Sequence, residues 1–246
     1  MSSRYNPGRV AGCLYLLTGF SIIRPMYVGP TLMVRDDATA TIHNIAAHEM
    51  LFRFGIVSDL IAGLGCLLAA LALYELLKGV DRKLGVLMVV LGGLMQCALA
   101  FVNVLNDAAA VVIARGEPFV SLFEKPQQAA LAALFLRIHD HGFLLSEVFA
   151  GLWLFPFGLL VFRSGFLPRI LGLLLFVSGF GYLTISGAGL LFPLYVERVS
   201  RIASPALLGE GGIILWLLIK GARPAPRQSQ WSDQPPIRRT AGYAAN

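Results

Sequence analysis

Three carboxylic acids stand inside long apolar stretches of this sequence. Asp59 lies in the stretch SDLIAGL, and Glu147 lies in SEVFAGL, which has its small residues in the same places. Glu210 lies in a third apolar stretch, within LGEGG. A carboxyl group in hydrocarbon is costly, so a recurring acid of this kind indicates a functional site. Such acids could hold a cation, share protons or coordinate a metal ion.

The composition is that of a membrane protein. The chain has 246 residues, of which 57% are hydrophobic and only 14% are charged, whereas about 25% are charged in an ordinary soluble domain. The mean hydropathy is +0.71. The net charge of +6 does not indicate nucleic-acid binding, because membrane proteins collect Lys and Arg on their cytoplasmic loops. The expected partner is the lipid bilayer, with a second membrane protein or another copy of the chain left open.

Six apolar runs are long enough to cross a bilayer as helices, which takes about 20 residues each. They are 10–28, 54–77, 84–113, 142–162, 170–191 and 205–219. We therefore predict an all-α protein whose residues 1–221 form one bundle of six transmembrane helices. The loops 30–53 and 114–141 are predicted to be largely helical, with a helix over 39–53 and another over 127–141 that runs into the fourth span.

The tight turns 78–83 and 163–169 are basic and lie on the same side as both ends of the chain. The excess of positive charge there predicts that both termini are cytoplasmic, in a bacterial inner membrane. Residues 222–246 are polar and rich in proline, so we predict a disordered cytoplasmic tail.

The second and third spans resemble the fourth and fifth. Asp59 is followed after 26 residues by Gly85, and Glu147 is followed after 25 residues by Gly172, in each case across a basic turn. This spacing predicts a parallel repeat of one helical hairpin, as in several transport folds.

The repeat predicts where the polar residues lie. The second, fourth and sixth spans run in the same direction, so their acids are expected in one layer of the outer leaflet, about five or six residues into each span. The candidate ligand-binding residues at this level are Asp59, Glu147, Glu210, Asn103, Asp107 and Arg24. The glycines at 172 and 179 and Ser186 form a stripe at heptad spacing, which predicts close helix packing.

Three readings of this polar cluster remain open, and no cofactor is specified. The leading one is an accessory membrane protein that binds a ligand or a partner at this cluster, with a protein that handles a small cation or protons as an alternative. The second is a metal-dependent hydrolase with Glu147, Asp59 and His141 as ligands or base; its weak metal candidates are His48, His139 and His141, since no HExxH pattern occurs. In the third, Arg24 and Arg53 merely neutralise the acids.

Several segments resemble one known family. They are LFRFGIVSDL (51–60), ALYELLK (72–78), RSGFLPRILG (163–172) and the closing stretch from Gly209-Glu210 to LWLLIKG (215–221). Together they are similar to the bacterial membrane family labelled domain of unknown function 4386, over about residues 9–221. The resemblance implies a multi-span membrane protein of unassigned activity, and it assigns no catalytic residue.

Overall fold

The computed structural model describes residues 6–223, and within this part of the chain every regular element is helical. Six helices are long and apolar enough to cross a membrane, which confirms the predicted all-α, multi-span fold. These spans are Pro7–Leu32, Glu49–Leu77, Arg82–Ala114, Lys125–Arg163, Arg169–Leu191 and Pro193–Ile219. The predicted tail lies outside the described residues from position 224 onwards.

Two of the spans change their winding along their length. The first consists of α1 (Pro7–Leu16), the 3₁₀ segment η1 (Leu17–Ile22), the π-helical segment η2 (Arg24–Val28) and α2 (Gly29–Leu32). The third consists of α5 (Arg82–Met88), the π-helical segment η3 (Val89–Met95) and α6 (Gln96–Ala114). Segments of this kind re-aim the side chains that follow them and are frequent at functional sites.

The loops are helical, but their boundaries differ from those predicted. The predicted helix 39–53 is interrupted at His48, where α3 (Ala38–Ala47) ends and α4 (Glu49–Leu77) begins. The predicted helix 127–141 is part of α7 (Lys125–Arg163), which continues into the fourth span as expected. The remaining elements are η4 (Pro118–Leu122), α8 (Arg169–Leu191), η5 (Pro193–Tyr195) and α9 (Val196–Ile219).

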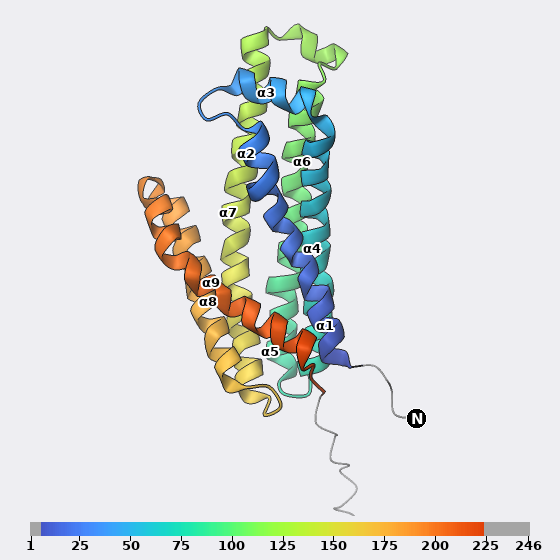
Figure 1. Ribbon diagram of the computed structural model, residues 1–246, viewed down its shortest axis with the longest axis vertical. Coiled ribbons are helices and arrows are strands. Elements are labelled where there is room, and N and C mark those ends of the chain that lie inside the picture. The colour runs from blue at the N-terminus through green and yellow to red at the C-terminus, as the bar shows by residue number, and fades with distance from the viewer. Residues whose placement is uncertain (1–5, 224–246) are drawn as a thin grey trace, which may run out of the picture.

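The six spans form a closed ring. In order around the ring, α1 packs on α4, α4 on α6, α6 on α7, α7 on α8, and α8 on α9, which returns to α1. Figure 1 shows α9 crossing the bundle obliquely, with its C-terminal end near the start of α1. At the end of the bundle that holds the termini, the interior is filled by an apolar core that includes Tyr15, Trp153 and Phe157.

Glycines hold α7 and α8 close together. A Cβ placed on Gly151 would come within 2.9 Å of the Gly179 carbonyl oxygen, and one on Gly158 within 2.9 Å of the Gly172 carbonyl oxygen. Ser186 continues the stripe, and its hydroxyl donates to the Leu144 carbonyl at 2.8 Å. The predicted packing role of the stripe is confirmed, because nothing larger fits where the two backbones meet.

The two predicted hairpins make matching local contacts. The hydroxyls of Ser58 and Ser146, one residue before each acid, both donate to the carbonyl three residues earlier at 2.7 Å. Gly85 faces the ring of Tyr74, and Gly172 faces Phe162; each aromatic residue lies 15 positions after its acid. The correspondence therefore extends from the sequence to the side-chain environment.

Candidate functional site

A cavity of about 770 Å³ lies inside the ring of helices. Every span contributes to its wall: Tyr15, Asp59, Asn103, Glu147, Tyr182 and Glu210 come from the first to the sixth span in turn. Four of the six candidate ligand-binding residues thus line one space. The other two, Arg24 and Asp107, are not among the lining residues; Arg24 contacts the lining residue Asp59 and pairs with Asp107.

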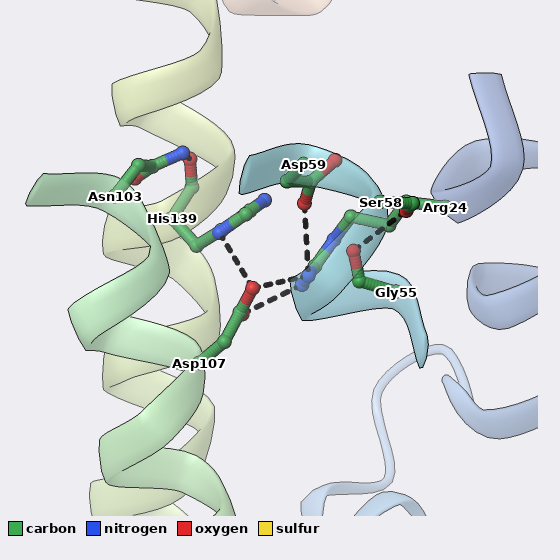
Figure 2. A network of polar contacts seen from close by, with 7 residues as sticks. All are labelled: Arg24, Gly55, Ser58, Asp59, Asn103, Asp107 and His139. Atoms are coloured by element: carbon green, nitrogen blue, oxygen red, sulfur yellow. Dashed lines mark hydrogen bonds and ion pairs between the residues drawn. The ribbon is translucent and has the colours of Figure 1, made fainter. Parts of the chain in front are cut away.

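An ion-paired group closes one part of the cavity, and Figure 2 shows its arrangement. The guanidinium of Arg24 donates to both oxygens of Asp107, from Nη1 to Oδ2 and from Nη2 to Oδ1, the latter at 2.8 Å. The same Nη1 lies 3.7 Å from Asp59 Oδ2, an ion pair without a hydrogen bond. Asp107 is fully buried, so its charge depends on Arg24 for compensation.

His139 extends this group towards the cavity. Its Nδ1 lies 3.1 Å from Asp107 Oδ2 but has no hydrogen-bond partner among the described residues. The Nδ2 of Asn103 donates to the His139 carbonyl oxygen at 3.0 Å and so ties α6 to α7. In the close-up the imidazole of His139 lies above Asp107 and the carboxylate of Asp59 lies above the Arg24 guanidinium, on the same side of the Arg24–Asp107 pair (Figure 2).

A second polar group surrounds Glu210. The hydroxyl of Tyr15 donates to Glu210 Oε1, and the hydroxyl of Tyr182 donates to Oε2 at 3.0 Å. These bonds join α1, α8 and α9 through one carboxyl group. The ring of Tyr15 also contacts Trp153 edge to face, with centroids 5.5 Å apart, which fixes the phenol in place.

Two carboxyl oxygens in the cavity wall lack a hydrogen-bond partner among the described residues. They are Oε2 of Glu147 and Oδ2 of Asp59, both buried. Asp59 still has the Arg24 ion pair, whereas no salt bridge within residues 6–223 reaches Glu147. A buried polar atom without a partner requires a reason, such as a bound ligand or water.

The three acids do not lie in the single layer predicted from the sequence. Asp59 is beside Arg24, whereas Glu210 is beside Tyr15, nine residues earlier on the first span, which is roughly 13 Å along a helix axis. The prediction was wrong because the spans begin earlier than the apolar runs. Glu210, for example, is 14 residues beyond the start of α9 at Val196 rather than five or six residues into its span.

The histidines predicted as metal candidates are separated. One oxygen or nitrogen atom from each of Asp59, Asp107 and His139 lies within 4.8 Å of the others, but Arg24 already reaches both acids with its charge. His141 is exposed, contacts the Arg137 carbonyl through Nδ1 at 2.8 Å and does not line the cavity. His48 lies at the junction of α3 and α4. The hydrolase set of Glu147, Asp59 and His141 is therefore not assembled, because α7 directs His141 away from the cavity.

Tyr15 and Tyr182 are site residues that the sequence analysis missed. Each is a phenol within an apolar run, and a buried tyrosine hydroxyl usually has a hydrogen-bond partner. That rule could have marked both as partners of a buried acid, but the spacing between α1, α8 and α9 in the sequence does not show which acid.

The fold and the cavity define the class: a polytopic, all-helical membrane protein with a carboxylate-lined cavity inside its bundle. A family model described as "Domain of unknown function (DUF4386)" matches residues 10–221, and the chain belongs to this family, as the resemblance implied. The chain is also 33% identical over 109 residues to an uncharacterized protein of Archaeoglobus fulgidus; the match covers 42% of this chain and 64% of that protein. No solved structure matches the chain.

Proposed function

We propose that this protein binds an amphipathic cation, a molecule with an apolar body and an ammonium group, in the cavity of its transmembrane bundle. The observation that supports this proposal is the carboxyl group of Glu147, which lies in the cavity wall with one buried oxygen unpartnered among the described residues. An ammonium group in the cavity would supply a compensating charge and a hydrogen bond to this carboxyl group.

The charges around the cavity favour a cation over an anion or a neutral ligand. The wall contains the three acids Asp59, Glu147 and Glu210, and none of the described lining residues is Lys or Arg. The guanidinium of Arg24 is directed at Asp107 and Asp59 and so leaves Glu147 uncompensated. A cation in a low-dielectric site is held strongly only when an opposite charge is close.

The rest of the wall favours an apolar body. It includes Leu99, Phe143, Leu207 and Ile214, which are interspersed with hydroxyl and amide side chains such as those of Thr18 and Gln96. Pockets that bind small molecules typically have volumes of about 300–1,000 Å³ and combine apolar walls with polar groups that fix the orientation of the ligand. The observed 770 Å³ lies within that range.

Binding of a matched pair of probes tests the proposal. The purified protein in lipid nanodiscs is titrated with dodecylamine and with dodecanol, which share a chain but differ in charge. We expect the wild-type protein to bind dodecylamine at least tenfold more tightly than dodecanol, since a charged hydrogen bond is worth roughly 1.5–3 kcal/mol. In Glu147→Gln the two affinities should become about equal. The control is Glu75→Gln, an exposed acid on α4 that pairs with Lys78 far from the cavity wall.

Two results would count against the proposal. One is equal affinity for the amine and the alcohol in the wild-type protein. The other is a ratio of amine to alcohol affinity that stays at the wild-type value in both Glu147→Gln and the control Glu75→Gln.

We further propose that both termini lie in the cytoplasm, with the protein in a bacterial plasma membrane. The basic turns support this orientation: Arg82 and Lys83 follow α4, and Arg163 and Arg169 flank the turn between α7 and α8. Reporter fusions test it. A fluorescent protein fused after Asn246 is expected to fluoresce, and alkaline phosphatase at the same position is expected to be inactive. The reverse pattern would refute the orientation.

A further inference from the structure

We infer that the ligand enters the cavity sideways from the lipid, between the later part of the first span and α9. This inference rests on the proposed binding function and specifies its ligand class: an amphiphile dissolved in the bilayer. It follows from how the ring of helices closes at one end of these two helices but not further along them.

The first span and α9 are held tightly together near the termini. Gly12 lets the helices approach so closely that a Cβ there would lie 3.0 Å from the Leu217 side chain. Arg9 Nη2 donates to the Ile219 carbonyl at 3.0 Å, and the backbone N–H of Gly8 donates to the Ala222 carbonyl at 3.1 Å. This end of the interface offers no passage.

Further along, the same two helices separate. Gly19 on η1 and Gly211 on α9 both line the cavity, and a Cβ added to either would meet no atom of the described chain within 4 Å. Along its length α9 packs on α1, α8 and η5, but it makes at most marginal contact with η1 and η2 of the first span. The cavity wall is therefore open between these two helices.

Hydrogen bonds and ion pairs hold the first span on both sides of this opening, but none of them bridges it. Tyr15 and Glu210 join the first span to α9 on the side of the termini. Arg24 and Asp107 join the first span to α6, which is on the other side of the ring. Between Tyr15 and Arg24, no hydrogen bond or ion pair among residues 6–223 links the first span to α9.

The helices on both sides of the opening form its rim and present apolar side chains to the lipid. The hydroxyls of Thr18 and Ser21, which also line the cavity, donate to carbonyls of their own span. Ile22 is 55% exposed on the first span, and Leu208, three residues before Gly211 on α9, is 77% exposed. Both helices are candidate membrane spans, so these side chains face acyl chains rather than water. A ligand that passes this rim must already be dissolved in the bilayer, and its ammonium group then meets Glu147 inside.

A transfer experiment tests this route. Vesicles loaded with a dansylated dodecylamine that keeps a free ammonium group are mixed with protein in nanodiscs, and energy transfer from tryptophan reports arrival. We expect the double variant Gly19→Phe/Gly211→Phe, which adds no tryptophan donor, to take up and release the probe at least about tenfold more slowly, because two phenyl rings fill the opening. Slower uptake together with slower release is the expected result, because a variant that only weakened binding would release the probe faster.

The matched control is Gly187→Phe on α8, which also has no atom within 4 Å of an added Cβ but does not line the cavity. The single variants Gly19→Phe and Gly211→Phe are measured as well, in case the double variant does not fold. Unchanged rates in folded rim variants would overturn the lateral route while leaving binding at Glu147 intact. Absence of binding in the wild-type protein would overturn the proposed function and this route together.

Discussion

Arg24→Gln is expected to lower the free energy of unfolding by about 3–5 kcal/mol, because it leaves a buried carboxylate without its counter-charge. The side chain of Asp107 has no exposed surface and receives two hydrogen bonds from the guanidinium. Asp59 would lose its ion-pair partner as well. Unfolding of the purified protein in mixed detergent micelles, followed by tryptophan fluorescence against increasing SDS, gives the measurement.

Two further variants show that the effect comes from the unpaired charge. Arg53→Gln removes an exposed arginine that pairs with Glu49 at 2.6 Å, and it should cost at most about 1 kcal/mol. The double variant Arg24→Gln/Asp107→Asn should be more stable than Arg24→Gln alone, because the buried charge has been removed together with its partner. If Arg24→Gln costs no more than Arg53→Gln, the pair does not hold the bundle together.

The ion pair also shows what the sequence could and could not predict. The position of Arg24 within the first span correctly indicated a partner among the three recurring acids, and the neutralisation hypothesis is confirmed for Asp59. The closer partner of Arg24 is Asp107, which that hypothesis did not include. Arg53, by contrast, pairs with Glu49 and Arg24 does not reach Glu147. Sequence spacing gives the position along one helix, but the choice of partner depends on how neighbouring helices are rotated and tilted.

The number of spans and their approximate extents were predictable because the free energy of burial in lipid depends directly on apolar run length. The depth of each acid was not, because α4, α7 and α9 extend beyond their apolar runs into polar sequence. The cavity itself could not be predicted either. It depends on the departure of η1 and η2 from α9, which is a property of the packed ring rather than of any single segment.

The small residues Gly172, Gly179 and Ser186 of α8 were predictable as a packing stripe, and Gly158, which faces this stripe from α7, carries the second large expected effect. Gly158→Leu should lower the free energy of unfolding by about 3 kcal/mol, because the new side chain must displace the backbone of α8. A Cβ added at this position would lie only 2.9 Å from the Gly172 carbonyl oxygen and 3.3 Å from the Leu175 side chain. Backbone atoms cannot rotate away as the end of a side chain can. The same SDS titration measures the loss.

A control on the neighbouring helix separates steric conflict from the general effect of a larger residue in a span. Gly187→Leu on α8 adds the same side chain where no atom lies within 4 Å of an added Cβ. It should be neutral or slightly stabilising, because leucine forms helix more readily than glycine.

A second variant on α7 extends the prediction. Gly151→Leu, which faces the Gly179 carbonyl, should lower the free energy of unfolding as Gly158→Leu does. It should also disturb ligand binding, since Glu147 lies one turn away on α7. Equal stabilities for the Gly158 and Gly187 variants would show that α7 and α8 can separate without cost, and the cavity wall they form together would then have no fixed shape.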